Sequence, residues 1–314
     1  MKVTFRVFRY NPEKDRVPHH EDYEIEVPQV MTVLEGLRKI KEEIDGTLSL
    51  RSSCRQAICG SCGMRINHFT KLACRTQVAD EVKKYGGVIL VEPMRNMTVL
   101  KDLIVDLSPF WTHMDRLKPW LIKDPSKPVP EKEYLMAKEQ VEDFFGTPNC
   151  IVCAGCHSEC PAVDVDKDFP GPAALAKLYR FAIDPRDGGG RSRLDEVTKM
   201  GLWWCLRCYQ CVEACPKNVR PGEVITNLRE MAHRTVGVLE RGGRHAEAFK
   251  QIVERFGILD EIKLARDTLG LSGTLKELPR GLKMFTRGKI LLSQKPIPKI
   301  EEVRRIYEEL RGRA

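Results

Sequence analysis

Cysteine is the residue type whose spacing most clearly indicates chemistry in this chain of 314 residues. All twelve cysteines fall into three groups of four, and none is left over. Thiolates set at such short intervals are ligands for soft metals. The groups are Cys54, Cys59, Cys62 and Cys74; then Cys150, Cys153, Cys156 and Cys160; then Cys205, Cys208, Cys211 and Cys215.

The spacing within each group is typical of iron-sulfur clusters. The first group reads C-x4-C-x2-C with a distant fourth cysteine, which is the plant-type spacing for a 2Fe-2S cluster. Both later groups read C-x2-C-x2-C-x3-C-P, the bacterial run in which the fourth cysteine ligates the cluster of the other run. We therefore expect one 2Fe-2S cluster and two 4Fe-4S clusters that carry electrons along the chain.

Two other uses of cysteine fit less well. Six disulfides would suit a short secreted protein, whereas a chain of this length can bury a core without them. Zinc sites use CxxC pairs, but zinc does not explain why three close thiols are twice followed by a fourth thiol and a proline, Pro161 and Pro216. His157 lies between cysteines, yet the thiols complete the coordination without it, so we expect it outside the ligand set.

Hydropathy and charge limit where the protein works. No run of eighteen apolar residues is present, so we expect no transmembrane helix. The start, Met1 to Val7, alternates like a strand and lacks the apolar stretch of a secretory signal, which predicts a reducing cytoplasm. The formal charge is +8, and residues 220–314 contribute most of it, with 20 Lys and Arg against 13 Asp and Glu.

A basic patch without acids lies between Leu278 and Ile300. Such a patch could contact anionic lipid, an acidic partner subunit or nucleic acid, or it could be an ordinary solvated face. Its six cations are Arg280, Lys283, Arg287, Lys289, Lys295 and Lys299.

The first 105 or so residues predict a small mixed α/β domain. Residues 3–10 and 22–27 alternate polar and apolar, which predicts two strands joined by a turn. Thr32 can cap a helix that ends before Gly46. We expect further strands at 64–69 and 88–91, and a helix over 99–107 that leads out of the domain.

The rest of the chain predicts helices. Five prolines between Pro109 and Pro130 interrupt any regular pattern, which indicates a connection between domains. The two later cysteine runs form an internal repeat, separated by 55 residues, with helical segments around them. Helical apolar spacing occurs over residues 131–145, 172–183, 193–204 and 222–235, and again in the tail around 245–257 and 300–311, with a stretch between them that glycines and lysines interrupt.

The predicted fold class is α+β. We expect a 2Fe-2S domain with the β-grasp fold of plant-type ferredoxins over residues 1–108, an all-α bacterial two-cluster ferredoxin domain over 109–235, and a basic helical tail over 236–314 that serves as a docking segment. The chain has no GxSxG, GxxxxGK or strand-bound GxGxxG motif, and Gly188 to Gly190 indicates a turn. We therefore expect electron transfer here and the two-electron chemistry in a partner.

Several stretches resemble one family. The domain order, together with RSSCRQAICGSC from Arg51 to Cys62, closely resembles the iron-sulfur subunits of succinate dehydrogenase and fumarate reductase. The resemblance covers roughly residues 1–235. It implies a subunit that passes electrons between a flavoprotein, where succinate and fumarate interconvert on FAD, and a further electron partner. Other family-like stretches are VDLSPF at 105–110, GPAAL at 171–175 and RFAIDPRD at 180–187.

The resemblance also implies which cysteines share a cluster. Most of the family has no cysteine at the position of Cys208 and carries a distal 3Fe-4S cluster. The fourth thiolate present here predicts a second 4Fe-4S cluster instead, and 3Fe-4S is the alternative. The implied sets are Cys54, Cys59, Cys62 and Cys74 for the 2Fe-2S cluster nearest the flavin; Cys150, Cys153, Cys156 and Cys215 for the middle 4Fe-4S cluster; and Cys160, Cys205, Cys208 and Cys211 for the distal cluster.

Two departures from the family bear on the second electron partner. Quinone-reducing members have a histidine after the first cysteine of the last run and tryptophans past the proline of the preceding run, where this chain has Leu206 and Ala162. The tail, with GLK at 281–283 and IEEVR at 300–304, resembles the iron-sulfur subunit of heterodisulfide reductases. The implied partners are the FAD-binding flavoprotein and either a membrane anchor or a cysteine-rich, heterodisulfide-reductase-like subunit, with no nucleic acid.

Two other functions stay open. The chain could serve a soluble thiol-linked or NADH-linked fumarate reductase or a related heterodisulfide-reductase-type complex. It could also be a free-standing ferredoxin-like carrier, although such carriers rarely have a long basic tail. In each case we expect a cytoplasmic protein, either free or peripheral on the cytoplasmic face of the cell membrane.

Overall fold

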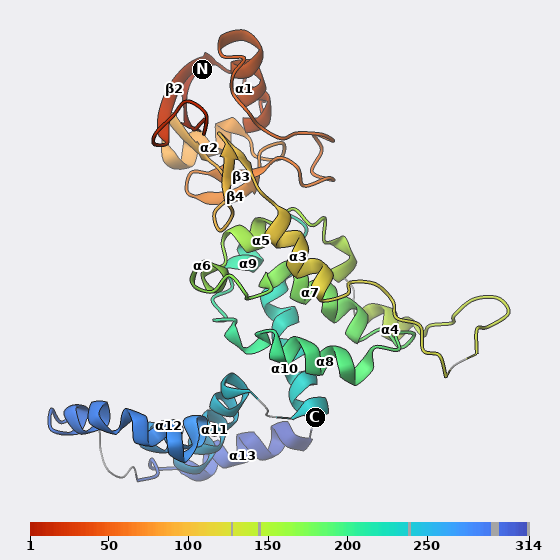
Figure 1. The fold of residues 1–314 in the computed structure, drawn as a ribbon, viewed down its shortest axis with the longest axis vertical. Coiled ribbons are helices and arrows are strands. Elements are labelled where there is room, and N and C mark those ends of the chain that lie inside the picture. The colour runs from red at the N-terminus through yellow and green to blue at the C-terminus, as the bar shows by residue number, and fades with distance from the viewer. Residues whose placement is uncertain (127, 144–145, 238–239, 290–294, 313–314) are drawn as a thin grey trace. The chain divides into compact units, whose positions relative to one another are not determined.

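The structure is a computed structural model that describes residues 1–126, 128–143, 146–237, 240–289 and 295–312. It contains two compact units, Met1–Glu230 and Met231–Ala314. Figure 1 shows a sheet in the N-terminal part of the first unit and helices in the part that follows. This order confirms the prediction of a mixed α/β region followed by a helical one.

A five-stranded mixed sheet forms the centre of the N-terminal part, in the order β2-β1-β5-β3-β4. β1 alternates as predicted: Val3, Phe5 and Val7 are buried, and they fill the core beneath the sheet. β1 pairs antiparallel with β2 and parallel with β5. The strands are β1 (Lys2–Arg9), β2 (His19–Glu26), β3 (Gly63–Ile66), β4 (Phe69–Leu72) and β5 (Val88–Glu92).

The first helix begins where the sequence predicted. The Thr32 hydroxyl accepts a hydrogen bond from the N–H of Glu35, and the Glu35 carboxylate accepts one from the N–H of Thr32, which is a capping box. Gly36 lets the helix approach the sheet closely, because a Cβ there would lie 2.5 Å from the Phe5 ring. The helices of this part are α1 (Val33–Lys39), which continues as a π-helical turn at Ile40–Ile44, and α2 (Val78–Tyr85).

Residues 99–107 do not form the predicted helix. They form a short hairpin of β6 (Val99–Lys101) and β7 (Ile104–Val105) that turns at Asp102, whose φ is 45°. The Asp102 side chain is buried, and its carboxylate accepts hydrogen bonds from the Arg9 side chain and from the N–H groups of Tyr10 and Ser49. These partners are distant in sequence, so local apolar spacing could not indicate the turn.

A helix occupies the start of the region that we expected to be irregular. α3 (Ser108–Arg116) contains Pro109 in its first turn, where the missing N–H would have no helical partner in any case. The described residues from 117 to 137 then form turns and irregular chain, as the prolines predicted. Of the residues described in the predicted helical segment 131–145, those that form a helix are Lys138–Asp143 (α4).

The cysteine runs lie among the helices that follow, as predicted. α7 contributes much of the core of this region, with Ala174, Leu175 and Leu178 buried. The elements are a 3-10 turn at Thr147–Asn149, α5 (Gly155–Ser158), α6 (Pro161–Val165), α7 (Gly171–Ala182), α8 (Gly190–Lys199), a 3-10 turn at Leu202–Trp204, α9 (Gln210–Glu213) and α10 (Pro221–Val236).

In the described part of the tail the helices are α11 (Arg241–Phe256), α12 (Glu261–Phe285) and α13 (Ile300–Gly312). α11 and α13 match the predicted amphipathic segments, whereas α12 was missed, because its glycines and lysines masked the helical pattern. α12 bends at Gly270, whose φ of 71° and ψ of 179° are not helical. Residues 290–294 of the predicted basic patch lie outside the described residues. Within the described residues, no helix has the length and apolar character needed to cross a membrane.

Candidate metal centres

The loop before β3 gathers the first group of cysteines. The Cys54 sulfur accepts hydrogen bonds from the N–H groups of Ile58 at 3.3 Å and Cys59 at 3.2 Å. The β3–β4 hairpin returns Cys74 to the same loop, where its sulfur accepts a hydrogen bond from the N–H of Ala57 at 3.2 Å. Backbone N–H groups aimed at sulfur favour the more negative, reduced state of a cluster.

Left-handed backbone bends produce this arrangement. Arg55 and Ala57 both have a φ of 58°, and Gly60 has a φ of 76°. A residue with a side chain pays about 1–2 kcal/mol for this conformation, and such strain collects at functional sites. Only Gly60 is of a type that predicts a bend, so sequence reasoning missed the other two.

The protonation of two thiols in this loop differs strongly. Hydrogen bonds, first from the Ser61 side chain and then from backbone N–H groups, lower the pKa of Cys59 to about 6. Burial raises the pKa of Cys62 to about 12, and the nearby thiols of Cys74 and Cys59 add to the effect. A positively charged metal centre would favour the thiolate form of both, so the group fits a cluster that is held by four thiolates.

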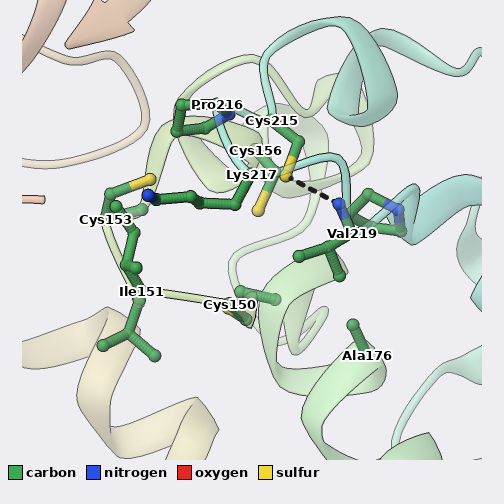
Figure 2. A pocket seen from close by; sticks show the side chains of 13 residues that line it. Cys150, Ile151, Cys153, Cys156, Ala176, Cys215, Pro216, Lys217 and Val219 are labelled. Carbon is green, nitrogen blue, oxygen red and sulfur yellow. Dashed lines mark hydrogen bonds between the residues drawn. The ribbon is translucent and has the colours of Figure 1, made fainter. Parts of the chain in front are cut away.

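The second group of cysteines lines a cavity together with the last cysteine of the third group. Figure 2 shows Cys153 on one side of it and Cys156 and Cys215 on the other, with the Lys217 side chain running between them. The Cys215 sulfur accepts a hydrogen bond from the N–H of Val219 at 3.3 Å. The cavity is lined by Cys150, Cys153, Cys156 and Cys215 and has apolar walls that include Ala173, Ala176, Val219 and Pro221.

The remaining cysteines line a second cavity. Pro161 and Pro172 form part of its wall, and the Tyr209 ring reaches it from the third group. Cys208 is exposed, whereas Cys160 and Cys211 are buried. The four cysteines around this cavity are Cys160, Cys205, Cys208 and Cys211. The structure thus brings together the members of all three predicted sets, and their role as cluster ligands stays a prediction.

The two runs repeat one backbone geometry. In the second group Val152 and Ala154 have φ values of 48° and 60°, and at the equivalent positions of the third group Arg207 and Tyr209 have values of 55° and 62°. A β-branched residue such as Val152 is rarely found with positive φ. The same bend at four non-glycine positions indicates that each loop wraps around a similar centre, a feature that residue types alone did not predict.

Burial disfavours free thiolates in both cavities. It raises the pKa of Cys153 to about 11 and that of Cys211 to about 12, and the neighbouring thiols oppose ionisation further. The pKa of Cys156, deep in the first cavity, is raised most clearly for the same reasons. Such thiols ionise only beside a strong positive charge, which an iron-sulfur centre would supply. The donor set therefore fits the clusters.

The described residues contain no three His, Cys, Asp or Glu side chains that converge closely enough for a single metal ion. His157, which we expected outside the ligand set, lines neither cysteine cavity. It is buried with its ring edge-on to Phe110, at 5.5 Å between ring centroids, and burial lowers its pKa to about 4.

The first cysteine loop lies directly against the second cysteine run. A Cβ on Gly60 would lie 2.7 Å from the Cβ of Cys153, so only glycine permits this approach. Arg75, next to Cys74, donates a hydrogen bond of 2.7 Å to the carbonyl oxygen of Pro216.

Buried polar contacts hold the same junction from the other side. The Thr70 hydroxyl donates to the Glu159 carboxylate at 2.6 Å and lies 2.8 Å from the Ser158 hydroxyl. The Asn96 amide donates to the carbonyl oxygens of His157, Ser158 and Cys160. These contacts join the sheet region to the helical region, so the first candidate site is held against the second.

The chain combines a mixed sheet domain that carries one four-cysteine loop with helices that carry two interleaved cysteine runs. This combination is typical of proteins with a 2Fe-2S centre and two further iron-sulfur centres. The comparisons agree. The 2Fe-2S iron-sulfur cluster binding domain family matches residues 4–112, and the 4Fe-4S dicluster domain family matches residues 147–219.

Relatives of known function match most of the chain. The fumarate reductase iron-sulfur subunit of Mycobacterium tuberculosis is 42% identical over 229 residues, which are 73% of this chain and 92% of the relative. The mitochondrial succinate dehydrogenase [ubiquinone] iron-sulfur subunit of Dictyostelium discoideum is 38% identical over 237 residues, covering 72% and 81%. A chain in the structure of the Mycobacterium smegmatis Sdh1 complex in the apo form has the same fold, with a TM-score of 0.66, 24% identity, and coverage of 74% and 96%.

This chain belongs to the family of iron-sulfur subunits of succinate dehydrogenase and fumarate reductase. It is the electron-transfer subunit of an oxidoreductase complex, and its cofactors are 2Fe-2S and 4Fe-4S clusters. Subunits of this family work with a flavoprotein and a membrane-anchor partner.

Proposed function

We propose that this chain passes electrons one at a time between an FAD-bearing subunit, where succinate and fumarate interconvert, and a second redox subunit. Bound iron-sulfur clusters supply the one-electron carriers. The proposal is carried by the exchange of cysteines between the two runs, since each cavity is lined by three cysteines of one run and one of the other. The proposed ligand sets are Cys54, Cys59, Cys62 and Cys74; Cys150, Cys153, Cys156 and Cys215; and Cys160, Cys205, Cys208 and Cys211.

The surroundings of the three sites suit an electron relay. The contact between Gly60 and Cys153 fixes the approach of the first site to the second. Apolar side chains form most of the wall of the middle site, with the Lys217 side chain beside them. Cys208 and Leu206 are exposed, which leaves the distal site accessible to the second redox subunit.

The fold and the limits of the matched families support three parts with separate roles. We propose the β-grasp fold for residues 1–108, because a helix packs on a sheet whose two central strands, β1 and β5, are parallel. We propose an all-α cluster domain over 109–235 and a docking tail over 236–314. Both matched domain families end before this tail, the later of them at residue 219.

The second redox subunit is proposed to be cysteine-rich and heterodisulfide-reductase-like. Leu206 and Ala162 support this choice, because they stand where quinone-reducing members have a histidine and a tryptophan. We place the complex at the cytoplasmic face of the membrane, with this chain peripheral to it. A quinone-reactive anchor and a soluble thiol-linked or NADH-linked reductase are the competing assignments.

Copurification tests the partners. The tagged chain is isolated without oxygen from its own host, from membranes and from cytosol, and every subunit that accompanies it is identified by mass spectrometry. A flavoprotein together with a cysteine-rich subunit is expected. A haem-bearing anchor would favour the quinone assignment, and the absence of any flavoprotein would overturn the proposed function.

Replacing Cys208 by serine tests the distal ligand set. The anaerobically oxidised wild-type protein should give no strong 3Fe-4S signal in low-temperature EPR, whereas Cys208→Ser should give one, with a higher reduction potential for that cluster. Tyr209→Phe is the control, because it alters the neighbouring residue and removes no thiol. A strong 3Fe-4S signal in the wild type without oxygen exposure, or no change in Cys208→Ser, would contradict the assignment of four thiolates.

A further inference from the structure

The second half of α12 presents two stripes that the electron-transfer function does not use. Its leucines recur at i, i+4, i+7 and i+11, and Phe285 extends the row by one more turn. The four leucines are 60–77% exposed, which is unusual for so regular an apolar row. They are Leu271, Leu275, Leu278 and Leu282.

A basic stripe with the same spacing lies on the opposite side of the helix. Because 3.6 residues make one turn, an offset of five residues places the cations about 140° from the leucines. Glu277 is the only acid from Leu271 to Lys289, and it already pairs with Arg280. Among the described residues, the other cations of this segment have no carboxylate partner; the stripe consists of Lys276, Arg280, Lys283 and Arg287, with Lys289 beyond the helix end.

The bend at Gly270 opens an apolar groove beside the leucines. Ile262, Ala265 and Leu269 of the first half line the groove together with Leu278, Leu282 and Phe285 of the second half. The first half is fixed at its beginning by Asp260, which caps it, and near its end by Thr268, whose hydroxyl lies 3.3 Å from His245 of α11. The second half therefore projects its apolar side from a fixed base.

We propose that the second half of α12 lies in the surface of an anionic lipid bilayer, with its leucines among the acyl chains and its cations at the headgroups. Helices that lie in a membrane surface combine Leu and Phe on one face with Lys and Arg on the other. The long cationic side chains can bend toward the headgroups from the flanks of the helix.

The distribution of charge favours lipid over a partner helix. A helix seated in the groove would meet a rim of mixed charge, Glu261, Glu277 and Arg280, and would not reach the remaining cations of the stripe. An anionic membrane attracts cations over about a Debye length, so it acts on the whole basic stripe. The basic stripe and the leucines then both contribute to the contact with the bilayer. This contact does not involve any of the proposed cluster ligands.

Vesicle flotation tests the proposal. The full chain with its clusters is mixed without oxygen with vesicles of phosphatidylcholine alone, or of phosphatidylglycerol and phosphatidylcholine in equal parts, and centrifuged through a density gradient. We expect flotation with the anionic vesicles only, and loss of flotation as the salt concentration rises.

Two variants separate the stripes. Leu275→Ser with Leu282→Ser should weaken binding by about 10-fold or more, because each leucine loses its transfer into the bilayer. Lys276→Gln, Lys283→Gln and Arg287→Gln together should weaken it about 100-fold, since each cation adds about fivefold near an anionic surface. Leu135→Ser is the control, because Leu135 is 84% exposed in a loop remote from α12 in sequence.

The proposal is overturned if the wild type does not float with anionic vesicles, floats equally with phosphatidylcholine, or floats unchanged after the leucine substitutions. Loss of a copurifying subunit in the leucine variant, without any flotation of the wild type, would assign the stripe to a protein partner instead. Circular dichroism of each variant shows whether the helices are retained. Cluster EPR spectra should be the same in all variants, which separates this proposal from that of the electron relay.

Discussion

Replacing Gly60 by alanine should strain the contact between the first cysteine loop and the second cysteine run. The added Cβ would lie 2.7 Å from the Cβ of Cys153 and 3.3 Å from the carbonyl oxygen of Ile151, so the two loops must move apart by several tenths of an ångström. Overpacking of this kind costs about 1–3 kcal/mol, and the positive φ of 76° adds about 1–2 kcal/mol for a residue with a side chain.

Gly86→Ala is the matched control. Gly86 also has a positive φ, 94°, yet no atom lies within 4 Å of the position its Cβ would take. The difference between the two variants therefore compares a positive-φ glycine that has the steric contact with Cys153 with one that has no such contact. With about 2–4 °C per kcal/mol for a unit of this size, Gly60→Ala should melt roughly 2–12 °C below Gly86→Ala.

The assay is thermal melting of the cluster-loaded protein without oxygen, followed by circular dichroism. EPR of the fully reduced protein gives a second measurement, because the magnetic interaction between two reduced clusters weakens as their loops separate. Equal melting midpoints for the two alanine variants, with an unchanged magnetic interaction in Gly60→Ala, would refute the conclusion that this glycine sets the approach of the two sites.

Three further changes test the structure around the sites. Arg9→Met should lower the melting midpoint by the equivalent of about 3–5 kcal/mol, because it leaves the buried Asp102 carboxylate charged without its cationic partner. Replacing the exposed Lys2 in Lys2→Met should change the midpoint little, and equal shifts for the two variants would contradict the argument. Thr70→Val should cost about 1–3 kcal/mol, since the Glu159 carboxylate loses a buried donor; a midpoint within error of the wild type would show that the junction does not depend on it. Removal of iron by a chelator should raise the rate of amide hydrogen exchange in the three cysteine loops before it rises in the sheet, because the loops lose the centres that order them. An equal and simultaneous rise in the sheet would contradict this expectation.

Local sequence patterns were sufficient to predict those elements whose structure depends on residues close together in the sequence. Alternation predicted β1 and β2, and Thr32 with Glu35 predicted the beginning of α1. The cysteine spacing also predicted which thiols meet, because in paired runs of this type the fourth cysteine lies with the other run. The family assignment followed from the same motifs, and the relatives confirm it.

The missed features depend on contacts between residues far apart in sequence. Residues 99–107 form a hairpin because Arg9, 93 positions away from Asp102, compensates the buried carboxylate at the turn. The first half of α12 packs against α11, as the contact between Thr268 and His245 shows, and this packing is not visible in the local sequence. The left-handed conformation of Val152 has no signal in its residue type, since the surrounding loop imposes it.

Because the two runs exchange one cysteine each, ordering the backbone at one cavity also helps to order the backbone at the other. Neither run can complete a four-cysteine cavity alone, because the first cavity needs Cys215 and the second needs Cys160. Cys160 directly precedes α6, and Cys215 lies two residues past the end of the short helix α9, so placing one sulfur orients the loop that bears the other three of its run. Occupation of either cavity therefore restricts the backbone of both runs, and the second cluster enters a site that is already partly ordered. On this reasoning the two sites assemble cooperatively, while the first cysteine loop, which draws all four of its cysteines from the sheet region, assembles independently.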